Sequence, residues 1–169
     1  FDAVEFLKTR GVIDGYDDGT FKPDGTINRA EAMKIVILGR YKWLNEEFDA
    51  GMLSDDEMGT AEPVFSDVSD EWFATYVSRA REQGIINGYE DGTFKPGNNI
   101  NKAESLKIIL LAFTIDETFT DPGKNPFPDV PFPAWYAKYV KYAKDKMVIE
   151  PDSFGNFNSA TDITRGEFA

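Results

Sequence analysis

Three cations stand at equivalent places in the sequence, where they could bind an anion. Arg29, Lys102 and Arg165 belong to the segments "INRAE", "INKAE" and "ITRGE", each preceded by Asn or Thr and followed two positions later by Glu. This pattern predicts the start of a helix closed by a capping box, which gives the Glu a structural role. A cation at the first helical position opposes the helix dipole by roughly 0.3–1 kcal/mol, so three such cations suggest a purpose.

Two explanations for these cations remain open. One is an ion pair with a nearby carboxylate, since the chain has 30 Asp and Glu residues against 18 Lys and Arg. The other is an anion site, in which free backbone N–H groups at the helix start and a guanidinium fork hold a carboxylate. Lys102 would bind as a point charge, so its copy would be weaker or differently selective.

Two tryptophans could serve as platforms for a sugar ring. Trp72 follows Asp67 in "FSDVSDEW", and Trp135 follows Asp129 in "FPDVPFPAW". Sugar C–H groups stack on an exposed indole, while a neighbouring carboxylate accepts hydroxyl protons. Tryptophan is more often a core residue, so the sequence leaves both roles open.

The loops "GYDDGTF" and "GYEDGTF" contain closely spaced acids that could hold calcium. Counting Asp14 as the first ligand puts Tyr16 at the third position and Gly25 at the twelfth, where a calcium loop needs oxygen ligands. The same count fails in the second loop. We therefore expect these Asp residues to form turns with the following Gly, and Phe21 and Phe94 to fill the core.

These features recur because the chain is built from repeats. The 25 residues from Gly11 share 16 identities with those from Gly84, which lies 73 positions later. A third, weaker copy begins at Met147, another 63 positions on. In the second copy we expect one helix from Trp72 to Gln83, then a turn, then a second helix beginning at Asn101.

The second helix of each repeat should lie at the centre of the fold. The segments "AEAMKIVILGRYKWL" and "AESLKIILLAF" are apolar on nearly every face, which is typical of helices in a buried bundle. The predicted fold is therefore mostly α, with three helix-loop-helix repeats. The predicted domains are repeat 1 at 1–48, incomplete at its N-terminus; an acidic connector at 49–64; repeat 2 at 65–117; a connector at 118–126; and repeat 3 at 127–169, with a degenerate loop and an incomplete C-terminus.

Composition narrows the possible functions. The chain has 169 residues, of which 41% are hydrophobic and 14% aromatic, enough for a folded core. It has no Cys and no His, which removes the usual zinc ligands, thiol nucleophiles and imidazole bases. A net charge of −12 disfavours nucleic acid as a partner. No apolar run of about 18 residues predicts a membrane span. We expect no cofactor, with loose calcium binding by the acidic connector as the alternative.

The repeats resemble the S-layer homology family. Its repeats carry an opening Phe-x-Asp-Val, a Trp, a Gly-Tyr-x-Asp-Gly-Thr-Phe-x-Pro loop and an Ile-Thr-Arg-Ala-Glu helix start, nearly all of which stand in "FSDVSDEW", "GIINGYEDGTFKP" and "INKAE". The resemblance implies a pseudo-threefold, three-pronged spindle around a central helix bundle. It also implies a bacterial cell-surface protein, anchored non-covalently to the cell wall. The implied ligand is peptidoglycan or an anionic secondary wall polysaccharide, which in many Gram-positive bacteria bears pyruvate ketals.

The family's grooves between prongs indicate which residues would touch the glycan. Carried over to this sequence, they are Arg29, Lys102, Arg165, Asp67, Trp72, Asp129, Trp135, Gly15 and Gly88. The chain departs from the family pattern at Lys102, which stands in place of Arg, and at Pro151 and Asp152, which replace Gly-Tyr. The first copy lacks the opening Asp and Trp within this chain.

Other functions remain in competition with glycan anchoring. The repeats could instead pack against other subunits in a surface lattice or filament. A glycosidase needs two carboxyls about 5–10 Å apart, and no acidic motif outside the repeats points to one, so we expect no enzyme. Under the anchoring hypothesis we expect Arg29→Ala or Arg165→Ala to reduce wall binding without lowering the melting temperature.

Overall fold

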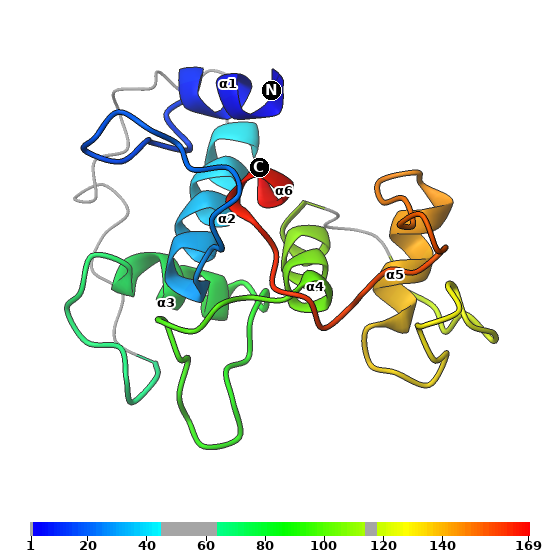
Figure 1. The fold of residues 1–169 in the computed structure, drawn as a ribbon. Coiled ribbons are helices and arrows are strands. Elements are labelled where there is room, and N and C mark those ends of the chain that lie inside the picture. The colour runs from blue at the N-terminus through cyan, green and yellow to red at the C-terminus, as the bar shows by residue number, and fades with distance from the viewer. Residues whose placement is uncertain (1, 45–63, 114–117) are drawn as a thin grey trace. The chain divides into compact units, whose positions relative to one another are not determined.

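The protein is described by a computed structural model that covers residues 2–44, 64–113 and 118–169 (Figure 1). These residues form α-helices joined by long loops, and strand-like pairing among them is limited to isolated bridges. The helices are α1 (Asp2–Thr9), α2 (Arg29–Leu44), α3 (Ala74–Glu82), α4 (Lys102–Phe113), α5 (Ala137–Asp145) and α6 (Arg165–Phe168).

The helices pair along the chain as the repeats predict. Each repeat has a short first helix, a long loop and a second helix, in the order α1–α2, α3–α4 and α5–α6. The mostly helical, repeated fold is therefore confirmed, whereas the spindle arrangement stays a prediction. The described residues form two compact units, one of residues 1–100 with 163–169 and one of residues 101–162. The predicted acidic connector lies outside the described residues except for Val64.

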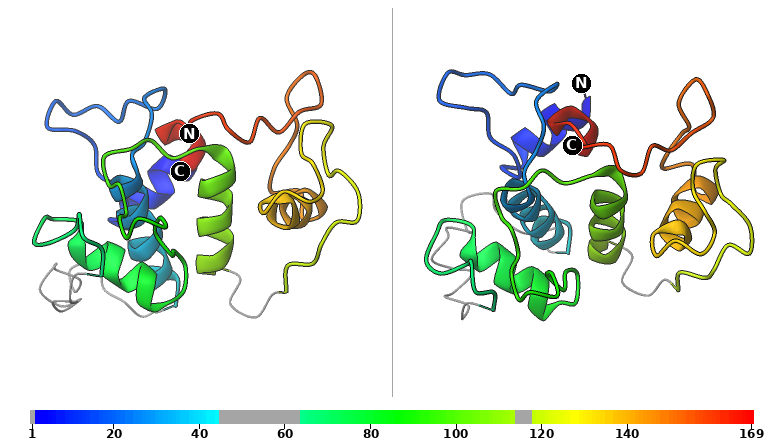
Figure 2. Two further views of the ribbon diagram at one scale, coloured as in Figure 1. Left: turned by 90° about the horizontal axis from the view of Figure 1, so that it is seen from below. Right: turned by 60° about the horizontal axis from the view of Figure 1, so that its bottom comes forward.

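The first unit is built around α2. Met33, Val36 and Ile37 of this helix are buried, because its apolar residues leave little polar surface. Helix α3 packs against α2 and lies beside it in every view, with Val77 and Ala80 fully buried (Figures 1 and 2). Its observed start at Ala74 is two residues later than the predicted helix start. The first unit thus has the helix at its centre that the sequence predicts.

The second unit has its own apolar core between α4 and α5. Leu106 and Leu110 of α4 pack with Val140 of α5 and with Phe127 and Phe157 from the segments on either side of α5. The two Phe rings stack with centroids 6.2 Å apart. One segment before and one after the helix therefore close the same core.

Helix starts have the predicted capping boxes. Asn28 accepts a hydrogen bond from the Glu31 amide at 2.9 Å, and the Glu31 carboxylate accepts one from the Asn28 amide at 3.0 Å. The same reciprocal pair joins Asn101 to Glu104 and Thr164 to Glu167. The structural role predicted for the Glu residues is confirmed.

Free N–H groups at the helix starts, which the anion hypothesis assumed, are absent at these positions, so that expectation was wrong. The amides of Arg29 and Ala30 donate to the carbonyls of Asn98 and Pro96, at 2.9 and 3.1 Å. Likewise, Arg165 donates to Gly25 at 2.8 Å. The amides of the first two helical residues, which a lone helix leaves unsatisfied, thus find carbonyls in the loop of another repeat. Any anion must therefore be held by side chains.

The same loops join three isoleucines in a closed cycle of hydrogen bonds within the first unit. The Ile100 amide donates to the Ile27 carbonyl at 3.2 Å, Ile163 donates to Ile100 at 3.0 Å, and Ile27 donates to Ile163 at 3.4 Å. Ile27 and Ile100 are completely buried. One residue from each repeat thus meets the other two, so the third repeat contributes directly to the unit formed by the first.

Candidate functional site

A groove of about 230 Å³ in the first unit brings together three of the predicted site residues, Gly15, Trp72 and Arg165. Each comes from a different repeat. Asp14, Tyr16, Glu31 and Lys34 also line the groove, so its lining includes two cationic, two acidic and two aromatic residues. This combination can bind an anionic, partly apolar ligand such as an acidic sugar.

Arg165 is fixed at the base of this groove. Its Nε donates to the Phe21 carbonyl at 3.0 Å, and its guanidinium carbon lies 4.7 and 4.9 Å from the ring centroids of Tyr16 and Phe21. Its Nη1 lies 3.4 Å from Glu31 Oε1, and its side chain is only 8% exposed. The ion-pair explanation for the helix-start cation is therefore confirmed for Arg165. The two rings and the Nε bond leave its terminal Nη groups directed away from Phe21.

Glu31 connects the helix cap to the groove. Its Oε2 caps the Asn28 amide, while its Oε1 pairs with Arg165. Arg165 Nη2 is also 3.5 Å from the Asp14 carbonyl. Both contacts of the guanidinium Nη groups are long, so they cost little to exchange for a stronger anionic partner.

The tryptophan at the rim is open to solvent. Trp72 is 54% exposed and packs edge-on against Phe73, with ring centroids 5.3 Å apart. The ammonium of Lys34 lies over the indole, 5.9 Å from the ring centroid. An exposed ring with a cation at its face suits a sugar that carries a negative charge.

In the second unit, Trp135 has the same surroundings. It is 53% exposed, packs edge-on against Tyr136, and has the Lys107 ammonium 5.5 Å from its ring centroid. A core role is thus excluded for Trp72 and Trp135. The lysines beside the two rings, Lys34 and Lys107, occupy equivalent positions in the first and second repeats.

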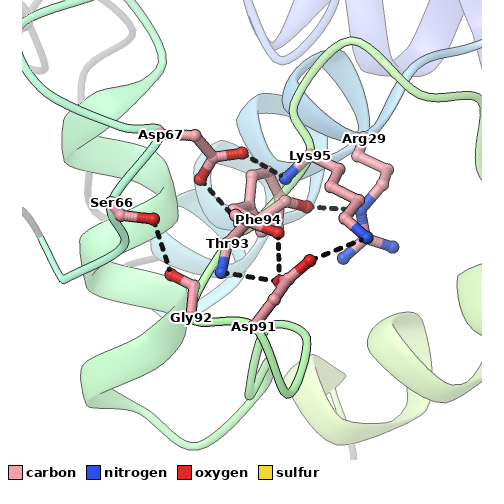
Figure 3. Close-up of polar contacts among 8 residues, drawn as sticks. All are labelled: Arg29, Ser66, Asp67, Asp91, Gly92, Thr93, Phe94 and Lys95. Atoms are coloured by element: carbon pink, nitrogen blue, oxygen red, sulfur yellow. Dashed lines mark hydrogen bonds and ion pairs between the residues drawn. The ribbon is translucent and has the colours of Figure 1, made fainter.

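The side chain of Arg29 makes the same kinds of contact as that of Arg165. Its Nε donates to the Phe94 carbonyl at 2.9 Å (Figure 3). Its guanidinium carbon lies 5.0 and 4.7 Å from the Tyr89 and Phe94 ring centroids. Arg29 is 6% exposed, and the Phe94 ring beneath it is completely buried. Phe94 is therefore the core residue that the sequence predicts, whereas Phe21 is only partly buried.

Lys102 lies in a different environment. It is half-buried, whereas Arg29 and Arg165 are buried. The loop position occupied by Tyr16 and Tyr89 in the other repeats is here Asp152, whose carboxylate accepts backbone amides of Phe154 and Asn156. The arginine and the tyrosine that stacks on it are thus replaced together, by Lys102 and Asp152.

Asp67 and Asp129 accept hydrogen bonds from the loop backbone of their own repeats. The two oxygens of Asp67 accept the amides of Phe94 and Lys95, both at 2.7 Å (Figure 3). Asp129 accepts the amides of Phe157 and Asn158 at 2.9 and 2.7 Å. These hydrogen bonds give both carboxylates a structural role, which is to hold the loop backbone in place. Contact of either carboxylate with a glycan stays a prediction.

Gly15 and Gly88 are required because neighbouring atoms approach them closely. A Cβ on Gly15 would lie 2.9 Å from the Thr20 carbonyl oxygen, and one on Gly88 would lie 2.2 Å from Phe65 Cε1. Gly88 also has a φ of 74°. Gly15 also lines the groove, so the absence of a side chain there leaves space in the groove and lets the loop backbone approach closely.

The loop acids form turns, as the sequence predicts. Asp18 Oδ1 accepts the amide and the hydroxyl of Thr20 at 3.0 and 2.6 Å, and Asp91 does the same with Thr93. The Thr20 hydroxyl and amide, followed by Lys22, lower the pKa of Asp18 to about 2. These carboxylates are therefore occupied at neutral pH by their own turn.

Sequence reasoning missed seven of the ten lining residues, among them Tyr16, Glu31 and Lys34. Glu31 was assigned only to the cap, and Tyr16 only to the turn. Lys34 had a detectable signal, because the Lys-Ile pair at Lys34 recurs at Lys107. Its place over a tryptophan from another repeat needed the three-dimensional fold.

The comparisons with known proteins agree with this architecture. The family model described as the S-layer homology domain matches residues 1–33, 64–104 and 126–169. The chain belongs to the S-layer homology family. The three matched regions each contain one helix start of the kind described above. Family membership and its relatives give the chain a place at the bacterial cell surface or cell wall.

Relatives of this S-layer homology chain are surface proteins. It is 34% identical over 133 residues to "Cell surface glycoprotein 1" of Acetivibrio thermocellus, covering 79% of the chain and 6% of that protein. It is 31% identical over 139 residues to the "Cellulosome-anchoring protein" of the same species, covering 82% of the chain and 28% of the relative. A third relative, 25% identical over 128 residues (76% of the chain, 22% of that protein), is named as an uncharacterized cell wall amidase of Bacillus anthracis. The chain thus spans less than a third of each relative. Within its described part, no helix is long and apolar enough to cross a membrane.

Proposed function

We propose that this chain anchors a bacterial surface protein non-covalently to the cell wall by binding an anionic secondary wall polysaccharide. The observation that carries the proposal is the groove in which Arg165, Lys34 and the exposed ring of Trp72 converge. The name of the cellulosome-anchoring relative supports the same role. The chain would act by binding alone, without catalysis, whatever the rest of the protein does.

The groove suits one acidic sugar. The terminal nitrogens of Arg165 form only long contacts, at 3.4 and 3.5 Å, which a ligand carboxylate would replace with shorter, bidentate ones. Trp72 would take the apolar face of the ring, and Lys34 would add a second positive charge. A pyruvate ketal has this combination of a sugar ring and a carboxylate.

Sedimentation with purified wall sacculi tests the proposal, before and after acid extraction of the secondary polymers. We expect the chain to pellet with intact sacculi and to stay in solution with extracted ones. Trp72→Ala should reduce pelleting, while Trp43→Ala is the matched control, because Trp43 is equally exposed at 53% but does not line the groove. Pelleting with extracted sacculi would point to peptidoglycan instead, and no pelleting with either would reject the anchoring function.

One observation favours the alternative, packing against other protein subunits. Met147, Val148 and Phe154 of the second unit are 87, 60 and 85% exposed, which is unusual for apolar residues close together in one repeat. If packing is the function, Val148→Ser and Phe154→Ser should abolish self-association in sedimentation velocity and leave wall binding unchanged. A monomeric wild-type chain at high concentration would reject this alternative.

A further inference from the structure

We infer that the second unit carries a separate binding surface for a linear, phosphate-bearing polyanion. The surface consists of Lys138, Lys141 and Lys144 on α5 together with Lys124 from the preceding segment, and we call it the lysine face. It shares no residue with the groove of the first unit, so the inference goes beyond the proposed function.

The lysine face has a hollow in which a polymer could lie. Lys124, Asn125, Lys141 and Lys144 line a depression of about 420 Å³, together with two prolines and Asp145. The ammonium of Lys144 donates to the Pro126 carbonyl, which holds the preceding segment against α5. Figure 1 shows this segment, in yellow, running beside the helix. The depression is therefore formed by two segments that a hydrogen bond joins.

The lysines follow each other at a regular spacing. Lys138, Lys141 and Lys144 are three residues apart on a nine-residue helix, which places their Cα atoms about 4.5 Å apart along the axis. Three charges in a slanting row over about 9 Å match a chain with an anion on every unit better than a single anion. Asp145, paired with Lys141, is the one acid that lines the hollow.

A comparison between repeats shows that the fold does not need this charge. The positions of Lys138, Lys141 and Lys144 are occupied by Thr75, Ser78 and Arg81 in α3. In α1 the same positions are Asp2, Glu5 and Lys8. The last position is a cation in each repeat, as the helix dipole favours near a C-terminus. The first two are cations in the third repeat alone, so helix stability does not explain them.

The side chains of the lysine face are suited to phosphate. The guanidinium fork of Arg binds either a carboxylate or a phosphate in two places, and Arg is the group in the first-unit groove. The lysine face contains no Arg, and Lys binds phosphate as a compact point charge. A wall polymer with phosphodiesters in its backbone fits this surface. In a chain with a net charge of −12, such a polyanion would approach the second unit by this face.

The test uses the whole chain and short-chain inorganic polyphosphate as the probe, measured by isothermal titration calorimetry at several salt concentrations. The test variant is K124Q/K138T/K141S, which takes two residues from the matching positions of α3 and retains Lys144 for its bond to Pro126. The matched control is K8Q/R10Q/R81Q, which removes three positive charges from exposed positions of the first unit.

We expect the wild-type chain to bind polyphosphate and the test variant to bind it on the order of a hundredfold more weakly at low salt. The slope of log K against log salt should fall by roughly 2 for three lost contacts. The control variant and Trp72→Ala should bind as the wild type does, so a failure of the anchoring proposal would leave this result interpretable. Equal losses in both triple variants, an unchanged test variant, or tighter binding of polygalacturonate than of polyphosphate would each overturn the inference.

Discussion

Arg165 has a structural role and a proposed binding role that a simple truncation cannot separate. Its Nε bond to Phe21 and its stacking on Tyr16 fix the loop of the first repeat, while we propose that its Nη groups exchange their long contacts for a ligand. The expectation that Arg165→Ala would leave the melting temperature unchanged was based on an exposed cation at a free helix end. The buried position of the side chain changes that expectation.

We now expect Arg165→Ala to lower the free energy of unfolding by about 1–3 kcal/mol, because a charge-assisted bond to a partly buried carbonyl is lost. Wall binding should fall as well. Urea denaturation measures the first effect, and Arg81→Ala, an exposed arginine outside the groove, is the control that should change stability by less than about 0.5 kcal/mol. An unchanged urea midpoint for Arg165→Ala would show that the Nε hydrogen bond contributes nothing to stability.

Met147 is a residue in an unfavourable backbone conformation. Its φ is 57°, at the repeat position where Gly11 and Gly84 have φ values of 60° and 71°. Its side chain is 87% exposed and loses little packing on removal. We predict that Met147→Gly stabilises the chain by about 0.5–1 kcal/mol, because only glycine adopts positive φ at low cost. Thermal unfolding checks this, and the reciprocal Gly84→Ala should destabilise the chain; a lower melting temperature for Met147→Gly would contradict the argument.

At the scale of the loop, the carboxylates of Asp67 and Asp129 hold the backbone in place. Asp67 accepts two consecutive amides, and one of them belongs to Lys95, whose φ is 57°. We predict that Asp67→Ala costs about 1–3 kcal/mol, since two amides lose a charged acceptor. Chemical denaturation gives the value, and Asp70→Ala, at an exposed position nearby, should have almost no effect. Equal effects of the two variants would show that the clamp is dispensable.

The turn at Asp18 makes the first loop sensitive to acid. Since the pKa of Asp18 is about 2 in the folded chain and 3.8 ordinarily, its contribution to stability is full above about pH 3.8. It is lost as the pH falls through about 2. Carboxyl NMR titration measures this pKa directly. Thr20→Val removes the hydroxyl donor and should raise the pKa of Asp18, whereas an unchanged value would assign the shift to other groups.

Elements defined by local sequence could be predicted, and those defined by distant contacts could not. The capping boxes at Asn28 and Thr164 depend on residues three positions apart, so their pattern is visible in the sequence. The carbonyls that occupy the amides of Arg29 and Arg165 come from other repeats, so no local pattern shows them. Exposure of Trp72 was equally undecidable, because the same residue type serves cores and binding surfaces.

Across the first unit, the repeats depend on one another. Ile163, Arg165 and Phe168 of the third repeat complete a unit that otherwise consists of the first repeat and most of the second. Phe168 is 6% exposed although α6 has only four residues. A repeat of this kind is therefore not an independent folding module in this chain.

We predict that Phe168→Ala lowers the free energy of unfolding by about 3–5 kcal/mol, as expected for a buried aromatic ring. Phe154→Ala is the control, since Phe154 is 85% exposed. Hydrogen exchange of the Ile27 and Ile100 amides should also become faster in Phe168→Ala, because both belong to the cycle that the third repeat closes. Unchanged exchange of both amides would show that the cycle forms without the last helix.

The groove's composition from three repeats has a mechanical consequence. A polymer held as we propose, by Trp72, Lys34 and Arg165, would pull on three separate stretches of chain at once. Arg165 passes its share of the load to the Phe21 backbone and to Glu31 on α2. Rupture would then require these connections to fail together rather than one after another.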